Sequence, residues 1–441
     1  MGGMHPIVYL PVEIKYRELP SRLLIARYML QAGYAVVIGN HWSMTSPPNQ
    51  AAFPEGLYLF KSVNRLQGNI MQLLRTNGHV VAANDEEALN FIEYNGYTVA
   101  FGDNAADACA LFFAQSPAHK AAIERRFPQL AGKVTVSGNP RIDLLSAKNR
   151  SAFLATDERV AACKPYILFN TNYSLINSVW GERVFAIAEG TGAFDGPDRD
   201  AKVREFQDIF EWEKRNHQAM LELLEWTARN VSGVNLVVRP HPGEKPSTWE
   251  QILAAIPNGR LIARSDPHPW ILGAKLLVHS GCTTGLEAVL LGTPAIDIMP
   301  TDHPTCDRIV SYANPRYRKP EDAAQAITAF LQRREGFPAG QATAALETHL
   351  PSYRDDTAAK IMAQGLAAEL AKHDAPPRKG FELTWRAPFT EYQRSAAERD
   401  KYAATVDEIR EGLRKAAVVA GASGEVRVET IGEGLFLATP R

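Results

Sequence analysis

The sequence predicts an α/β protein with two Rossmann-like domains facing a central cleft and a C-terminal helical tail. Short apolar segments alternate with helical stretches, an order typical of parallel sheets covered by helices. The alternation is interrupted once, by a connector of mixed polarity at residues 146–164. Polar loops rich in small residues directly follow several apolar segments, as they do at the ligand-binding edge of such sheets. The expected domains are residues 1–150 and 151–372, and the expected tail is residues 373–441.

Length and composition exclude several classes of protein. The 441 residues suffice for two or three domains, and a hydrophobic fraction of 45% lets each domain bury a core. The net charge of −1 does not indicate a nucleic-acid-binding protein. The N-terminus lacks the charged-then-apolar order of a signal peptide, and no apolar run approaches the roughly 18 residues of a membrane span. The 4 cysteines show no metal-ligand spacing. We therefore expect a cytoplasmic protein with reduced cysteines and no metal site.

The first domain is predicted from apolar segments separated by helical periodicity. A helix at residues 21–32 would begin with Ser21 as its N-cap and stop at Gly33. The acidic run at residues 85–87 is expected to open another helix, because acidic side chains favour the positive end of the helix dipole. The predicted strands are residues 7–12, 34–39, 57–61, 79–83, 98–101, 110–114 and 133–137.

The second domain repeats this alternation around a long amphipathic helix at residues 200–230. The preceding residues 180–200 are rich in glycine, aspartate and aromatic residues and predict a loop. This loop contains Asp198-Arg199-Asp200, a string that would suit a metal ion, but its position before a helix favours N-terminal capping. The predicted strands are residues 165–170, 235–238, 260–263, 275–278 and 294–298, the other helices are residues 286–291, 321–333 and 357–372, and the tail holds a charged helix at residues 391–416 and an alternating apolar segment at residues 426–437.

Two loops organise the expected site. The strand at residues 235–238 leads into Arg239-Pro240-His241-Pro242. The strand at residues 275–278 leads into a small-residue loop at residues 279–285, which opens a helix near Leu286. Both loops should lie at one edge of a parallel sheet, because ligands bind beyond the carboxyl ends of its strands. Backbone N–H groups at a helix start bind anions, and a histidine can hold or protonate a leaving phosphate. We therefore interpret the two loops as the site of an enzyme that splits a nucleotide-activated sugar.

Six short segments of the chain occur in the same order in a known protein family. They are PVEIKYREL (residues 11–19), NDEEAL (84–89), SGNPRIDLL (137–145), FNTNYS (169–174), RPHP (239–242) and HSGCTTGLEA (279–288). On these segments the chain resembles bacterial surface-carbohydrate biosynthesis proteins of lipopolysaccharide and capsule loci. Part of the set also resembles sialyltransferases and Kdo transferases, which use cytidine-monophosphate (CMP) sugars on a GT-B fold. The acidic motif of those enzymes has glycine where this chain has Ala88.

The resemblance implies a glycosyltransferase without metal or other cofactor, moving a Kdo-like or nonulosonic acid sugar from a CMP donor to a surface glycan or lipid-linked acceptor. Glu86, and after it Asp85, would be the base or nucleophile, and His241 would stabilise the leaving phosphate. Glu287 would bind ribose hydroxyls. The resemblance does not extend to the tail, for which the sequence leaves open a lid, a partner-binding segment or a contact with the membrane surface. The other residues expected to bind the donor are Arg239, Pro242, Ser280, Gly281, Thr283, Thr284, Asn139, Thr171 and Asn172.

Other functions stay open at this stage. A UDP-sugar 2-epimerase would share the small-residue loop and the glutamate-bearing helix, but it fits the acidic and RPHP segments less well. A glycerophosphotransferase that uses CDP-glycerol would share the HP and serine-loop elements, although such enzymes are usually more basic than this chain. A glycan-binding or scaffold protein without turnover is the non-enzyme alternative. The competing structural interpretations are an internal salt bridge for Arg239 and plain helix capping for the loop at residues 279–285.

Overall fold

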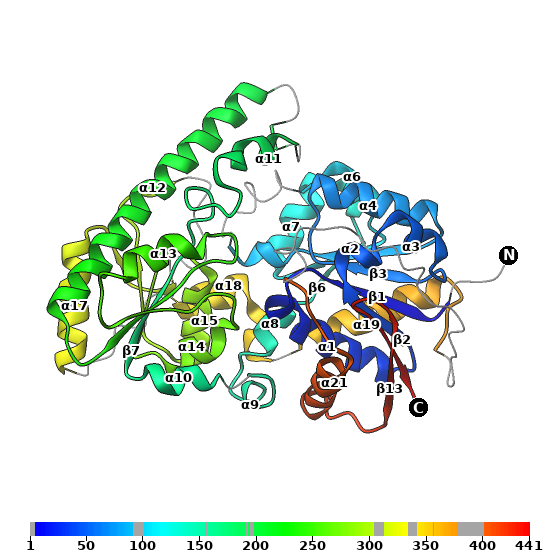
Figure 1. Ribbon diagram of the computed structural model, residues 1–441. Helices are drawn as coiled ribbons and strands as arrows, with labels where there is room; N and C mark the ends of the chain where they lie inside the picture. The colour runs from blue at the N-terminus through cyan, green and yellow to red at the C-terminus, as the bar shows by residue number, and fades with distance from the viewer. Residues whose placement is uncertain are drawn as a thin grey trace. The chain divides into compact units, whose positions relative to one another are not determined.

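The chain folds into two compact units, each built on its own sheet (Figure 1). This α/β architecture confirms the predicted fold class. Unit 1 comprises the described residues of Met1–Ala88, Tyr94–Leu154 and Glu347–Arg441, and unit 2 those of Leu89–Glu93 and Ala155–Leu346. The computed structural model describes residues 5–90, 101–154, 157–190, 193–194, 198–303, 313–333, 342–355, 357–377 and 401–441.

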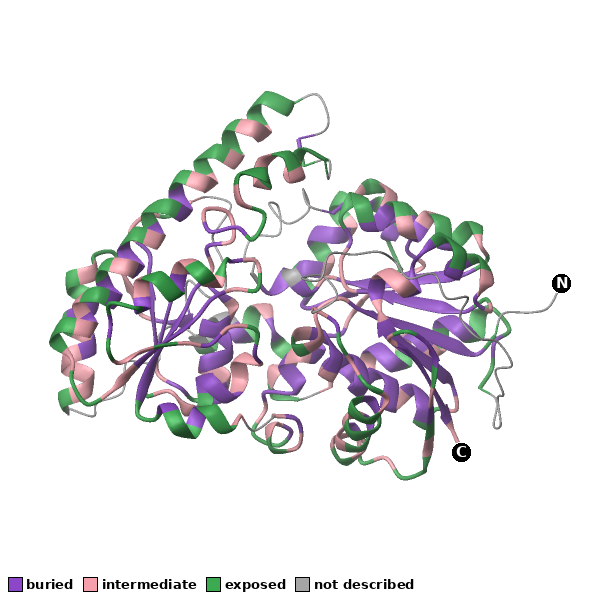
Figure 2. Ribbon diagram, in the orientation of Figure 1, coloured by how far each residue is buried: buried purple, intermediate pink, exposed green. Residues whose placement is uncertain are grey.

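Unit 1 contains an eight-stranded sheet with the order β13-β14-β2-β1-β3-β4-β5-β6. The strands from β1 to β6 are parallel, and β13 and β14 form an antiparallel hairpin that pairs with β2 through β14. The parallel strands are mostly buried (Figure 2), as expected where helices cover both faces. The strand expected at residues 98–101 lies outside the described residues except for Phe101, which is not in a strand. The bounds are β1 Ile7–Val12, β2 Ala35–Asn40, β3 Leu57–Phe60, β4 Val80–Asn84, β5 Leu111–Ala114, β6 Val134–Val136, β13 Val426–Gly432 and β14 Leu435–Pro440.

The first helix of unit 1, α1 (Lys15–Gln31), begins six residues before the predicted start. The Glu18 carboxylate accepts hydrogen bonds from the backbone N–H groups of Glu13 and Ile14, at 2.7 and 3.2 Å, and stabilises this earlier start. Ser21 therefore lies inside the helix and is not its N-cap. The other helices of the N-terminal part are α2 His41–Met44, α3 Pro47–Ala52, α4 Arg65–Thr76, α6 Asp103–Ala108, α7 Pro117–Arg126, α8 Pro140–Asp143 and α9 Arg150–Phe153, with 3-10 turns at Glu86–Asn90 and Pro128–Leu130.

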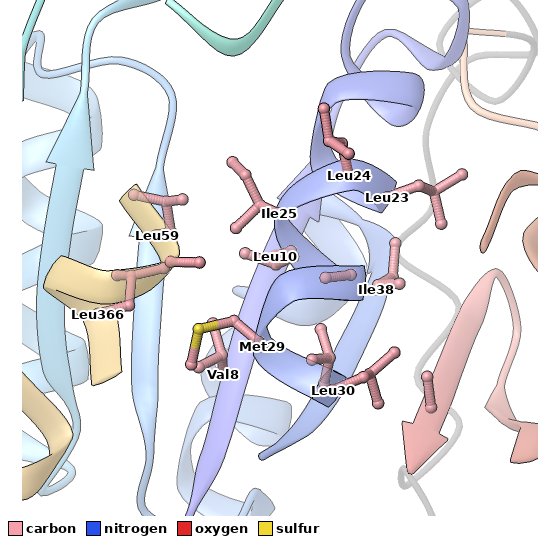
Figure 3. Close-up of a cluster of buried hydrophobic side chains, with 14 of the residues drawn as sticks. Val8, Leu10, Leu23, Leu24, Ile25, Met29, Leu30, Ile38, Leu59 and Leu366 are labelled. Carbon is pink, nitrogen blue, oxygen red and sulfur yellow. The ribbon is translucent and has the colours of Figure 1, made fainter. Parts of the chain in front are cut away.

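The C-terminal segment belongs to unit 1 and is not a separate tail. Helix α19 (Ala358–Lys372), expected in the second domain, packs against α1, and so does α21 (Val406–Ala420). Leu366 of α19 lies in the same apolar cluster as Leu59 (Figure 3). The boundary expected at residue 372 thus differs from the structure, because burial of these apolar faces returns the chain to the first sheet. The helix expected at residues 391–416 begins at Val406 within the described residues.

Unit 2 contains a six-stranded parallel sheet with the order β12-β11-β10-β7-β8-β9. The long helix α12 (Arg199–Asn230) confirms the prediction. Helix α11 (Val184–Gly190) forms within the segment predicted as a loop, where Phe185 stacks on Phe194. Helix α15 (Thr283–Leu291) begins three residues before the expected position. The strands are β7 Tyr166–Asn170, β8 Asn235–Arg239, β9 Gly259–Leu261, β10 Leu276–His279, β11 Ala295–Ile298 and β12 Arg316–Tyr317. The remaining helices are α10 Glu158–Cys163, α13 Pro246–Leu253, α14 Pro267–Gly273 and α17 Pro320–Arg333, with a 3-10 turn at Gly181–Arg183. Helix α18 (Ala342–His349) spans the point in the sequence where unit 2 ends and the last segment of unit 1 begins, and the 3-10 turn at Pro351–Arg354 belongs to unit 1.

Candidate functional site

Polar residues gather at the carboxyl edge of the unit 2 sheet. Strand β7 ends in Asn170, β8 in Arg239 and β10 in His279, and all three side chains are buried. The Asn170 Oδ1 accepts a hydrogen bond from Arg239 Nη1 at 3.3 Å, and its Nδ2 donates to Cys282 Sγ at 3.6 Å. The two loops singled out in the sequence therefore flank β7 at one edge. Strands β8 and β10 are not adjacent in the sheet, because β7 lies between them.

Glu244, which was not assigned from the sequence, holds the loop after β8. This carboxylate is buried, and its Oε1 accepts from the backbone N–H of His241 at 2.9 Å and from the Thr171 hydroxyl at 2.7 Å. Its Oε2 accepts from Trp249 Nε1 at 2.9 Å and from Asn177 Nδ2 at 3.4 Å. Glu244 thus ties the RPHP loop to the loop after β7. The only sequence signal was its position two residues after the second proline of RPHP.

The His241 imidazole has a defined tautomer. The backbone N–H of Gly243 donates to its Nδ1 at 3.0 Å. Because Nδ1 accepts this bond, the neutral ring carries its hydrogen on Nε2. The residue is half-buried, and the neighbouring Pro242 is exposed. A ring fixed in this way can donate from Nε2 to a phosphate oxygen, which is the chemistry predicted for it.

Arg239 makes mainly internal contacts. It is 7% exposed, and its Nη2 donates to the carbonyl of Ser265. Burial lowers the pKa of its guanidinium, and the carboxylates of Asp266 and Glu287 act against this shift. Within the described residues its Nε has no hydrogen-bond partner. Both terminal nitrogens of Arg239, Nη1 and Nη2, thus donate to groups within unit 2. Only Nε is left to bind a ligand.

Three backbone N–H groups of the small-residue loop already have acceptors. Gly281 donates to Asp297 Oδ1 at 2.9 Å, Cys282 donates to His279 Nδ1 at 3.3 Å, and Gly285 donates to the carbonyl of Cys282 at 3.0 Å. Helix α15 begins directly after Cys282, and the first N–H groups of a helix have no acceptor within it. The buried Thr284 hydroxyl lacks a hydrogen-bond partner in the part of the chain that the structure describes. Of the groups predicted to bind an anion, those at the start of α15 are therefore the best candidates.

Asp297 on β11 anchors this loop by accepting a hydrogen bond from the Gly281 N–H. Asp297 was not assigned this role from the sequence. Its side chain is fully buried, its Oδ2 accepts from Arg316 Nε at 2.8 Å, and its Oδ1 lies 3.7 Å from His279 Nδ1. Burial lowers the pKa of His279 and so favours the neutral ring. Gly281 has a φ of +56°, a left-handed conformation that favours glycine. The sequence signal was an aspartate inside an otherwise apolar strand.

Glu287 on α15 belongs to a second polar group. Its Oε2 lies 3.6 Å from His268 Nε2, and His268 Nδ1 lies 2.8 Å from Asp266 Oδ1. Burial acts to raise the pKa of Asp266, but His268 and Arg239 lower it below its usual value. Its contact with His268 gives the Glu287 carboxylate a structural role, and its binding of ribose hydroxyls stays a prediction.

The remaining residues expected to bind the donor have varied surroundings. Burial raises the pKa of Tyr173, and a hydrogen bond with Ser280 opposes this rise. Asn172, which directly precedes Tyr173 in the sequence, is half-buried. In unit 1, Asn139 follows β6 and accepts from the backbone N–H of Arg141 at 3.0 Å, so that it caps α8. Thr283, the first residue of α15, is half-buried.

The acidic run expected to act on the acceptor lies in unit 1. It opens a 3-10 turn at Glu86–Asn90 and not the expected α-helix within the described residues. Asp85 is half-buried, whereas Glu86 is 2% exposed and its Oε1 lies 3.5 Å from Arg22 Nη2. The side chain of Glu87 lies outside the described residues. The catalytic roles of Glu86 and Asp85 stay predictions.

In the described ranges, no three His, Cys, Asp or Glu side chains are grouped as metal ligands would be. Asp198 occupies the N-cap position of α12, but its side chain makes no capping hydrogen bond, so the expected capping role is not observed. Arg199 forms an ion pair with Glu189. No helix among the described residues combines the length and apolar character required to cross a membrane.

Comparison with known proteins shows the fold. No family model matches the sequence, and no curated protein matches it. A solved Listeria monocytogenes protein assigned as a UDP-N-acetylglucosamine 2-epimerase aligns with a TM-score of 0.50 and 12% identity, over 87% of this chain and 100% of that chain. A variant of the wall teichoic acid polymerase TagF aligns with a TM-score of 0.51 and 12% identity, over 84% of this chain and 90% of that chain. These similarities confirm the predicted two-unit GT-B fold.

Proposed function

We propose that this protein is an enzyme acting on a nucleotide-activated sugar, and that unit 2 binds the nucleotide. The observation that carries the proposal is the meeting of the α15 start and the His241 loop at one sheet edge, on either side of Asn170. A helix start favours a phosphate, and the buried Thr284 hydroxyl adds a donor there. The Nε2–H of His241 would stabilise the charge that develops on the leaving phosphate. Glu287 would bind ribose hydroxyls.

A UDP-sugar is the first donor class to consider. The Listeria structure is named for a UDP-N-acetylglucosamine substrate, and the TagF structure is named for synthesis of a surface polymer. This supports a UDP-sugar transferase or epimerase in surface-glycan synthesis over a CMP-sugar enzyme. The second candidate, transfer of a Kdo-like sugar from a CMP donor, is favoured by the six sequence segments. Glycerophosphate transfer from CDP-glycerol would use the same phosphate site.

The experiment that tests the proposal compares nucleotides on the full chain. Calorimetric titration with UDP, CMP and CDP should reveal binding of at least one of them, and Thr284→Val should weaken that binding by roughly tenfold through loss of one hydrogen bond to a charged group. Turnover of UDP-N-acetylglucosamine, CMP-Kdo and CDP-glycerol then identifies the donor. Binding of none of the three nucleotides would contradict the proposed function.

A further inference from the structure

Five charged side chains gather at the carboxyl edge of the unit 1 sheet. Glu13 follows β1, Lys61 follows β3 and Glu86 follows β4, while Glu18 and Arg22 reach the group from α1. Lys61 Nζ lies 2.6 Å from Glu18 Oε1 and 2.9 Å from Glu13 Oε2. Arg22 Nη2 lies 3.5 Å from Glu86 Oε1. This is the edge at which open α/β sheets bind ligands.

One half of this group is saturated with hydrogen bonds and the other half is not. Lys61 bonds to two carboxylates, and Glu18 accepts two backbone N–H groups in addition to Lys61. Among the described residues, the Nε and Nη1 of Arg22 and both carboxylate oxygens of Glu86 have no hydrogen-bond partner. Arg22 is 0% exposed and Glu86 is 2% exposed, so bulk water does not supply the missing hydrogen bonds. Leaving buried charged groups in this state is costly.

Electrostatics also argue against a purely stabilising role for Glu86. Burial raises the pKa of Glu18, Lys61 lowers it, and the charge of Glu86 raises it further. The charge of Glu86 therefore disfavours the charged form of Glu18 and favours that of Arg22, while its carboxylate has no hydrogen-bond partner among the described residues. A buried carboxylate without hydrogen bonds reduces stability, and groups that do so are typical of binding and catalytic sites.

We propose that Arg22 and Glu86 form a binding site for the hydroxyl groups of a sugar or polyol. A hydroxyl both donates and accepts, so adjacent hydroxyls can accept from the Arg22 guanidinium and donate to the Glu86 carboxylate. Glu13 and Lys61 of the same group are the more exposed members, with side-chain exposures of 25% and 15%. The polyol would be the acceptor of the transferred group, and this assignment as acceptor rests on the proposed function. Binding of the polyol itself does not.

The test measures binding of glucose, N-acetylglucosamine and glycerol to the full chain by saturation-transfer NMR. At least one of them should give a signal with the natural protein, and that signal should fall at least tenfold in Glu86→Gln and in Arg22→Lys, which keeps the charge but loses the planar donor set. The matched control is Asp143→Asn, because Asp143 is also a buried carboxylate of unit 1 and accepts from the N–H groups of Ala358 and Ala359.

A Tm measurement accompanies each variant. Asp143→Asn should lower Tm and keep the polyol signal. Glu86→Gln removes one partner of a buried pair with Arg22 and should also lower Tm, but it should lose the signal while still folded. Absence of a signal from the natural protein, or a signal that persists in folded Glu86→Gln, would overturn the inference. Titration with UDP and CMP is run on the same samples. If a nucleotide binds and no polyol does, this inference alone fails; if a polyol binds and no nucleotide does, only the proposed function fails.

Discussion

Glu244 and Gly243 determine how the His241 ring is presented. The carboxylate of Glu244 anchors the backbone of His241, and the Gly243 N–H holds Nδ1. The ring is therefore fixed both at its main chain and at one nitrogen, which leaves Nε2 as its hydrogen-bearing atom. Preorganised donors of this kind act on charge that develops during the reaction, because they need no reorientation when it forms.

This arrangement predicts a selective loss of turnover in His241→Asn. The Asn Oδ1 can take the place of Nδ1 and accept from Gly243, but no donor remains at the position of Nε2. Turnover should fall by roughly 10²-fold or more, while Tm and nucleotide affinity change little. Steady-state kinetics measure the effect, with whichever of UDP-N-acetylglucosamine, CMP-Kdo and CDP-glycerol the protein turns over. The control is His373→Asn, the same substitution at an exposed histidine of unit 1. Equal turnover in the two variants would remove His241 from the proposed chemistry.

At the scale of elements, the start of α15 depends on strand β11. Asp297 binds the Gly281 N–H and the Arg316 side chain from a fully buried position, so the loop before the helix is tied to the sheet. Breaking one partner of a buried ion pair leaves an uncompensated charge. Asp297→Asn should therefore lower the free energy of unfolding by about 3 kcal/mol and weaken nucleotide binding, as measured by urea titration and calorimetry.

Asp302 provides the matched control for that substitution. It pairs with Arg316 Nη1 at 3.0 Å and with Arg318 Nη2 at 2.7 Å, but its side chain is 64% exposed. Solvent screens such pairs, so Asp302→Asn should cost less than about 1 kcal/mol and leave nucleotide binding unchanged. Equal losses in the two variants would show that the loop does not depend on its buried anchor.

The elements differ in how far the sequence predicts them. Most of the parallel strands and α12 follow from local apolar patterns, and the structure confirms them. Strand β12 (Arg316–Tyr317) was not predicted, because its two residues are too few to form an apolar pattern. The predicted start of α1 was wrong. The Glu18 side chain, which lies inside the helix, accepts hydrogen bonds from two backbone N–H groups that precede the helix and so stabilises an earlier start. Asp143 supports α19 across more than two hundred residues, and no local pattern reveals such a contact. For the same reason Glu244 and Asp297 were missed, although the loops that they hold were found.

At the scale of the whole molecule, both described ends of the chain belong to unit 1. The hairpin of β13 and β14 extends its sheet beyond β2, and α19 and α21 cover α1. The apolar residues of these segments complete the core shown in Figure 3. The two sheets carry different chemistry at their carboxyl edges: unit 2 has a helix start and a histidine, and unit 1 has a buried set of carboxylates and cations. This division suits a reaction in which a phosphate leaves and a hydroxyl group is bound.

Buried histidines link the stability of the whole molecule to pH. Burial lowers the pKa of His119 to about 3. In the unfolded chain a histidine titrates near pH ~6.5, so below that pH the unfolded state binds a proton that the folded state does not. The stability contributed by neutral His119 is therefore complete above pH ~6.5 and is lost as pH falls towards ~3. The other histidines of the described residues whose pKa is lowered chiefly by burial are His79, His217, His279 and His349.

The free energy of unfolding should consequently be lower at pH 5 than at pH 8, with about 2 kcal/mol of the difference due to His119. His119→Asn isolates this part, because its Oδ1 can replace the Nδ1 that accepts from the Gln115 N–H at 3.3 Å, and asparagine does not titrate. Urea titrations at the two pH values should show a difference that is about 2 kcal/mol smaller in this variant than in the natural protein. His373→Asn serves as the exposed control. If the pH dependence of His119→Asn matched that of the natural protein, the acid sensitivity would originate in other groups.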